Sequence, residues 1–182
     1  MKQKIFKTKE FFSLSLIAIA VLSRFIPHPP NFSPVASIAL LSGYSFSNRV
    51  KSFLVPIIAM IISDFFIGFH STMWAVYLSF SLCVIFGFLL KKNFSFYKLF
   101  AFSVASSLLF YLITNFAVWL TSGMYPHTLA GLFQCYTMGL PFYRTSTLDF
   151  FAFSLFGDIF YSFVLFGALK LAEKKIPLEG KI

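Results

Sequence analysis

Long apolar runs constrain this sequence more than any other feature. Hydrophobic residues make up 58% of its 182 residues and charged residues only 12%, whereas a soluble domain is about 45–50% apolar and about 25% charged. A soluble core of this size does not bury so much apolar surface, so we expect the surrounding solvent to be lipid. The length and composition predict one all-α integral membrane domain over residues 1–182.

Six apolar segments predict six transmembrane helices. They cover residues 11–27, 34–46, 52–69, 73–90, 97–122 and 148–172. Segment 34–46 is shorter than the roughly 17–25 residues that a spanning helix needs. We therefore expect it to be tilted against its neighbours, broken, or extended by the following loop.

The connection over residues 123–147 contains a second short apolar stretch, residues 129–140. It is too short to span a bilayer. Thr128 can cap the start of a helix there, and Pro141 limits its end. We expect this segment to form a re-entrant or interfacial cap on the external side.

Basic residues alternate between the connections of these segments. Thirteen of the 15 Lys and Arg residues fall in the two tails and in the loops after the second and fourth segments, and the exceptions are Arg24 and Arg144. The positive-inside rule then predicts six spans with both termini in the cytoplasm, in the bacterial cytoplasmic (inner) membrane. This orienting role accounts for the net charge of +9, so we expect no nucleic-acid partner.

Most of the other unusual polar residues fall on the opposite, external side. The candidates for lining or bracing a pocket there are Arg24, His28, Asn31, Asp64, His70, Asn115, His127, Arg144 and Asp158. Charged groups in lipid are costly and usually face a bundle interior or a cavity, which makes them candidates for function.

Several of these candidates also have a structural interpretation. Asp64 can pair with Arg24 or Arg144. Asp158 sits deeper in its segment, which favours a buried pair or a protonated state. Asn115 is typical of a hydrogen bond between helices.

Motifs for catalysis or metal binding are missing from the sequence. The three histidines lie in three different connections, without a metal-ligand spacing. Cys83 and Cys135 are far apart, so we expect neither a disulfide nor a zinc site. With no nucleophile elbow, phosphate loop or HExxH motif, we predict no enzyme, no cofactor and no ATPase of its own.

Five runs of sequence resemble the signature of a family of small bacterial membrane proteins, known as a domain of unknown function. They are Leu-Ser-Arg-Phe-Ile-Pro-His-Pro-Pro-Asn-Phe-Ser-Pro-Val-Ala at 22–36, Phe-Leu-Val-Pro-Ile-Ile-Ala-Met-Ile-Ile-Ser-Asp at 53–64, Leu-Ile-Thr-Asn-Phe-Ala-Val-Trp at 112–119, Tyr-Pro-His-Thr-Leu-Ala-Gly-Leu at 125–132 and Gly-Asp-Ile-Phe-Tyr at 157–161. That family is similar to the substrate-binding S components of energy-coupling factor (ECF) vitamin transporters. The resemblance implies six helices, both termini inside and a ligand pocket on the outer side.

S components often carry an Ala-xxx-Ala pair in the first helix, where they dock a coupling subunit. The first segment here has none. The second segment contains Ala39-xxx-Gly43, a pair of small residues that permits close approach of helices.

Together these features predict a membrane subunit that captures a small-molecule substrate, a micronutrient such as a vitamin or its precursor, from outside. Its partners are then the lipid bilayer, the ECF coupling subunit and the ATPases. The external segment containing Pro141 is a candidate lid. Two alternatives stay open: a membrane scaffold or assembly protein without a ligand, and an intramembrane enzyme using Asp64, Asp158 and a histidine as general acid and base.

Overall fold

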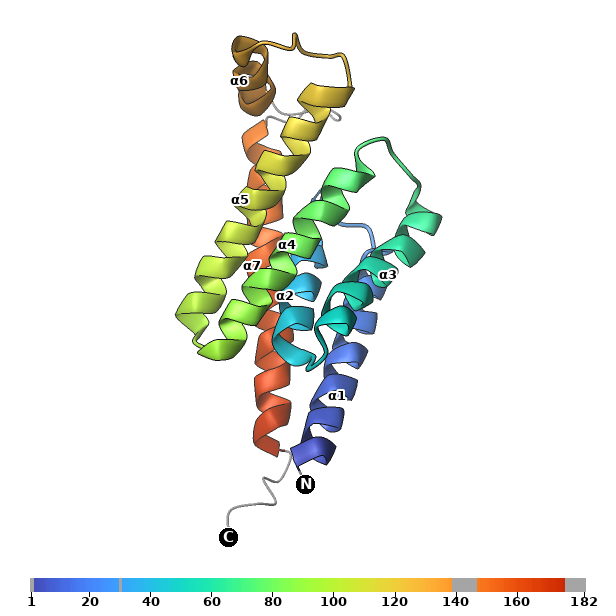
Figure 1. Ribbon diagram of the computed structural model, residues 1–182, viewed down its shortest axis with the longest axis vertical. Helices are drawn as coiled ribbons and strands as arrows, with labels where there is room; N and C mark the ends of the chain where they lie inside the picture. Colours follow the sequence, from blue (N-terminus) through green and yellow to red (C-terminus); the bar gives the residue numbers. More distant parts are fainter. Residues whose placement is uncertain (1, 30, 139–146, 176–182) are drawn as a thin grey trace.

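The computed structural model describes residues 2–29, 31–138 and 147–175, which form seven α-helices and contain no strand (Figure 1). The helices are α1 (Lys2–Ser23), α2 (Val35–Ser45), α3 (Arg49–Ile67), α4 (Met73–Lys92), α5 (Phe96–Thr121), α6 (Leu129–Met138) and α7 (Thr147–Lys175). The all-helical prediction is confirmed for this part of the chain.

Four helices are long and apolar enough to cross a membrane: α3, α4, α5 and the part of α7 from Ala152 to Lys174. By this measure the chain is a multi-pass membrane protein. Large apolar side chains cover the outside of the bundle, including Phe65 and Phe66, which are each 71% exposed. Such a surface suits lipid, where apolar groups have no water to avoid.

The first two predicted spans are shorter. Lysines and Glu10 occupy the start of α1, which leaves its apolar part too short for a bilayer core of about 30 Å. The 11 residues of α2 reach about 16 Å at a rise of 1.5 Å per residue. Length and composition therefore single out four spans among the described residues, where the sequence predicts six.

The short helix α2 lies in the middle of the bundle, and all of its residues are buried. It contacts α1, α3, α4, α5 and α7. Irregular backbone is costly in lipid and is tolerated where protein covers it. Enclosure by five neighbours therefore lets a short helix exist inside a membrane bundle, with loops on both sides.

Two glycines mark a close approach of the α2 and α4 backbones. A Cβ atom on Gly43 would lie 2.1 Å from the carbonyl oxygen of Val84, and one on Gly87 would lie 2.3 Å from that of Leu40. No side chain fits at such distances, so the two backbones pack directly on each other. The close approach predicted from Ala39-xxx-Gly43 is confirmed at Gly43.

The two ends of the bundle differ. At one end, which we call the basal end, α1 begins, α7 ends, and the α2–α3 and α4–α5 connections lie (Figure 1). The opposite end carries the α1–α2 and α3–α4 connections and α6, and we call it the cap end. Both basic connections, around Arg49 and around Lys91, therefore lie at the basal end.

Candidate functional site

A pocket lies inside the bundle beside the first turn of α2. It is lined by Asn31, Ser33, Ala36, Phe80, Phe110, Ser154 and Asp158. These residues come from the α1–α2 connection and from α2, α4, α5 and α7. Its enclosed volume is about 30 Å³. Pockets for drug-sized ligands measure roughly 300–1,000 Å³, so this one is small.

Asp158 supplies the one charged side chain among the described residues that line the pocket. It is 5% exposed, and its Oδ2 accepts a hydrogen bond of 2.6 Å from the Ser107 hydroxyl. Within the described residues, no donor or cation bonds to Oδ1. The buried ion pair that the sequence favours for Asp158 is therefore not formed in this part of the chain.

Buried serines surround Asp158. Ser37 of α2 donates to the backbone oxygen of Asp158 at 3.0 Å and lies 2.9 Å from the hydroxyl of Ser162. Ser154, Asp158 and Ser162 are spaced by four residues, which places them on one face of α7. Sequence reasoning did not select these serines, although their spacing is the signal that could have found them.

The α1–α2 connection packs against α7 where it borders the pocket. Asn31 has a φ of 62°, a left-handed conformation that Asn tolerates better than most residues, and its carbonyl accepts a hydrogen bond of 2.9 Å from the Ser33 amide. Phe32 packs on Tyr161 with ring centroids 5.6 Å apart. A Cβ on Gly157 would lie 3.0 Å from the Cα of Phe32, so this glycine lets the connection lie against α7.

A second buried carboxylate, Asp64, is fully paired. Its Oδ1 accepts from Nη2 of Arg24 at 2.9 Å, and its Oδ2 accepts from the hydroxyl of Tyr77 at 3.0 Å. Nη1 of Arg24 also donates to the hydroxyl of Ser63. This cluster joins the end of α1 to α3 and α4. It matches the structural interpretation in which Asp64 pairs with Arg24.

The three histidines lie away from the pocket and are exposed. Nδ1 of His28 is 2.9 Å from the backbone oxygen of Pro29, and Nδ1 of His70 is 3.0 Å from the hydroxyl of Thr72. His127 packs edge-on against Trp119. No cluster of three or more metal-ligating side chains occurs in the described ranges.

Of the remaining two candidates, Asn115 lies outside the pocket lining described above. Asn115 donates from Nδ2 to the backbone oxygen of Tyr111 in its own helix, at 2.8 Å. The predicted hydrogen bond between helices is therefore wrong for its side chain. Arg144 lies outside the described residues, as does Pro141 of the candidate lid.

The short helix α6 packs on the end of α5, which confirms a short helical segment in this connection. The hydroxyl of Thr128 caps it by accepting from the Gly131 amide at 3.1 Å, as the sequence predicts. The Tyr136 hydroxyl donates to the Leu112 oxygen at 3.0 Å, and the Cys135 thiol donates to the Asn115 oxygen at 3.2 Å. Burial raises the pKa of the Cys135 thiol, which makes it a packed rather than a reactive cysteine.

One comparison places the sequence in a family. The family model DUF6580, described as a family of unknown function, matches residues 4–179. The chain belongs to this family. No curated protein matches it, and no solved structure matches it. In this DUF6580 chain the matched range includes every pocket residue and both buried aspartates.

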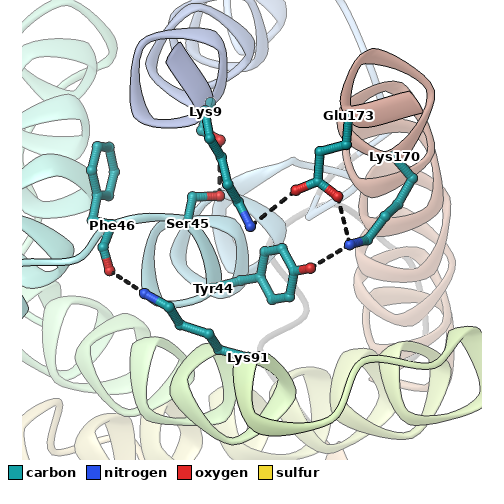
Figure 2. A network of polar contacts seen from close by, with 8 residues as sticks. Lys9, Tyr44, Ser45, Phe46, Lys91, Lys170 and Glu173 are labelled. Atoms are coloured by element: carbon teal, nitrogen blue, oxygen red, sulfur yellow. Dashed lines mark hydrogen bonds and ion pairs between the residues drawn. The ribbon is translucent and has the colours of Figure 1, made fainter. Parts of the chain in front are cut away.

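The basal end of the DUF6580 chain carries a separate polar network (Figure 2). Glu173 of α7 pairs with Lys9 at 3.0 Å and with Lys170 at 2.7 Å. Lys170 also donates to the hydroxyl of Tyr44, and Nζ of Lys9 lies 4.1 Å from the centre of the Tyr44 ring. The network therefore joins α1, α2 and α7.

Lys91 of α4 lies beside this network and bonds the end of α2 (Figure 2). Its Nζ donates to the backbone oxygen of Phe46 at 2.7 Å. Phe46 directly follows α2, whose last carbonyls need partners because the helix cannot supply them. Basic side chains near a helix C-terminus are also favoured by the helix dipole. A lysine that the sequence assigns to orientation thus also holds the end of the buried helix.

The three polar clusters of the DUF6580 chain differ in whether they leave a polar group available to bind a ligand. The Arg24–Asp64 cluster pairs its charges internally, and the lysines of the basal network bond Glu173, the Tyr44 hydroxyl or the Phe46 oxygen. The Asp158 pocket combines empty space with a carboxylate oxygen that no described donor occupies. It is the arrangement best suited to hold a small polar molecule.

Proposed function

We propose that this chain is a substrate-binding membrane subunit that captures a micronutrient, a vitamin or a vitamin precursor, in the Asp158 pocket. The observation that carries the proposal is Oδ1 of Asp158, which no described donor bonds, on a side chain that lines the pocket. Asn31, Ser33 and Ser154 supply further polar groups at the same place. Binding sites of this kind combine an apolar wall with a few well-placed polar groups.

The position of the pocket supports a transport role. Asp158 lies six residues into the apolar stretch Ala152–Lys174, about 9 Å along the helix at a rise of 1.5 Å per residue. Transporters place their substrate sites within the membrane, where broken helices leave irregular backbone next to a cavity. The α1–α2 connection followed by the short helix α2 is such a break.

We further propose six passes with both termini in the cytoplasm of a bacterium, in the inner membrane, and an S-component-like bundle. In this arrangement α1 and α2 complete the six passes although neither is long enough to span by itself, because the surrounding helices enclose α2, and the pocket faces outward. The grouping of basic connections at the basal end supports this orientation through the positive-inside rule. Because the sequence contains no ATPase motif, inward release depends on partners of the ECF type, a coupling subunit and ATPases.

The size of the pocket sets a condition on the substrate. A vitamin fits only when the pocket widens or when one polar end of the molecule enters. The α1–α2 connection carries Asn31 and Ser33 and is the one wall without regular structure. We expect this wall to shift when a large substrate binds.

A screen of vitamins, their precursors, nucleobases and metal ions tests the proposal. The full chain in lipid nanodiscs should unfold at a higher temperature with its substrate, since a ligand that binds the folded state stabilises it. Asn31→Ala should weaken that binding about tenfold or more. Ser81→Ala is the matched control, because Ser81 donates only to Tyr77 of its own helix. A folded wild-type chain that no compound stabilises would contradict the proposal.

One observation favours a second candidate, a membrane scaffold or assembly protein. The Arg24–Asp64 cluster and the basal network both join helices, and their charged side chains bond other groups of the chain. A scaffold needs stable helix packing and no binding pocket. Under this alternative, Asn31→Ala changes the unfolding temperature alone, and the screen yields no ligand.

A further inference from the structure

The pocket has a distinctive charge character. Among the described residues that line it, Asp158 is the one charged group, and Asn31, Ser33 and Ser154 add neutral oxygen atoms. The described cations lie elsewhere: Arg24 pairs with Asp64, and the lysines bonded in the basal network lie at the other end of α2. A ligand in the pocket therefore meets a negative site.

Burial favours the neutral form of Asp158, and two features of the pocket act in the opposite direction, toward the ionised form. The Ser107 hydroxyl donates to Oδ2 at 2.6 Å, within the short range of hydrogen bonds to charged carboxylates. The first turn of α2, which contains Ala36, borders the same pocket. The N-terminus of a helix carries a partial positive charge that stabilises a nearby anion.

An ionised carboxylate at this burial needs a partner for its second oxygen. Asp158 is 5% exposed, and an unpaired buried charge is strongly unfavourable. Hydroxyl groups and the amide oxygen of Asn31 can accept hydrogen bonds from a donor that sits beside Oδ1. A group with one positive charge and several N–H donors satisfies all of these requirements together.

The aromatic wall of the pocket suits the same group. Phe80 and Phe110 line it and stack with ring centroids 5.5 Å apart and an angle of 15° between the rings. Cations are attracted to the faces of aromatic rings. The apolar wall can also contact the carbon atoms that are bonded to a charged nitrogen in an organic molecule.

We propose that the substrate presents a protonated nitrogen, as an ammonium, amidinium or guanidinium group, and that this nitrogen pairs with Oδ1 of Asp158. This inference rests on the proposed binding function and names the chemical class of its substrate. The enclosed volume of about 30 Å³ suits the charged nitrogen itself, since a water molecule needs about 10–15 Å³ by the same measure. The rest of a larger substrate then lies toward the α1–α2 connection.

Four small probes separate the contributions of charge and hydrogen bonding. They are ethylammonium, which has both, tetramethylammonium, which has charge without N–H donors, sodium, and neutral propanamide, each added at equal ionic strength to the full chain in nanodiscs. We expect ethylammonium alone to raise the unfolding temperature in a saturable way. Equal stabilisation by sodium, tetramethylammonium or propanamide, or none by ethylammonium, overturns the inference.

Two variants test whether the effect arises at Asp158. Asp158→Asn keeps the size of the side chain and an acceptor for Ser107, and it should weaken ethylammonium at least about tenfold. Ser154→Ala, which removes one acceptor and leaves the carboxylate, should weaken it about threefold to tenfold. Ser154→Ala provides the test if the Asp158→Asn variant does not fold. Unchanged ethylammonium affinity in the folded variants overturns the inference.

The outcome also separates this inference from the proposed function. A vitamin that binds wild type and Asp158→Asn equally, and is lost in Asn31→Ala, leaves the binding function standing and overturns the protonated nitrogen. Binding of neither vitamins nor ethylammonium to a folded chain overturns both. The control variant Ser81→Ala should bind vitamins and ethylammonium as the wild type does.

Discussion

Asp64 and Asp158 have the same burial, 5% exposed, and different neighbours. Asp64 has partners on both oxygens, including a guanidinium, whereas Asp158 has a described partner on one. The local donors, and not depth or residue type, therefore separate a carboxylate that braces helices from one that is available to a ligand.

Removing the cation beside Asp64 should be costly. Arg24→Gln leaves the carboxylate buried with Tyr77 alone, and breaking one side of a buried pair costs about 3–5 kcal/mol. We expect a lower free energy of unfolding in a denaturant titration of the purified chain. Replacing both partners, in Arg24→Met with Asp64→Leu, should recover most of the loss, because no charge remains unpaired. A double variant as unstable as Arg24→Gln would contradict this account.

Sequence reasoning at the residue scale reached the charged groups and missed their hydroxyl partners. Asp158, Asn31 and the Arg24–Asp64 pair stand out in the sequence because charges and amides are rare in apolar runs. Serine is common in membrane helices, so Ser107 carries no such signal. Its role depends on the rotation of α5 against α7, which only the packed structure determines.

At the scale of elements, α2 shows how backbone contact shapes the bundle. Its small residues allow α4 to pack directly on it at Gly43 and Gly87. Small residues at helix contacts are the usual means of association in membranes, where the hydrophobic effect does not draw helices together. The pocket depends on this contact, since Ala36 and Phe80 line it from α2 and α4.

A side chain at this contact should disrupt the fold. Gly87→Leu places its Cβ 2.3 Å from the Leu40 oxygen, so the two helices must separate, and we expect little folded protein by size-exclusion chromatography. Gly167→Ala is the control, because a Cβ there meets nothing within 4 Å. It should keep or raise the unfolding temperature, since alanine favours helix by roughly 0.5–1 kcal/mol. Normal yield of Gly87→Leu would show that the contact is not needed.

The sequence placed α2 and gave its length closely, but it left three arrangements open. A tilted helix, a broken helix and an extended one all fit the apolar run at residues 34–46. The structure shows a short helix that is enclosed by α1, α3, α4, α5 and α7. This enclosure depends on how the other helices pack, so the apolar run alone does not predict it. The shortness of α6, by contrast, followed from Thr128 and the length of the apolar stretch alone.

At the scale of the whole molecule, polar groups are arranged differently at the two ends. The basal end collects lysines that pair with Glu173 or bond the end of α2. The Asp158 pocket lies beyond the other end of α2, on the side of the cap. This division is consistent with a molecule that is anchored at one end and binds at the other.

Thiol labelling tests the proposed orientation. Ser47→Cys places a thiol in the α2–α3 connection at the basal end, and Ser71→Cys places one in the α3–α4 connection at the cap end. Both positions are exposed. On intact cells, a membrane-impermeant maleimide should label Ser71→Cys and should label Ser47→Cys only after the cells are opened. The reverse pattern would invert the topology. Wild type is the control, since Cys83 and Cys135 are buried.

The enclosure of α2 also has a consequence for the order of events during synthesis. The ribosome makes α2 second and α7 last, yet Ser37 of α2 bonds Asp158 and Ser162 of α7. Until α7 emerges, that polar face of α2 has no partner, and the helix is too short to remain in the bilayer by itself. We therefore expect α2 to pack stably only after α7 has been synthesised. A chain truncated before α7 should be degraded by proteases faster than the full chain.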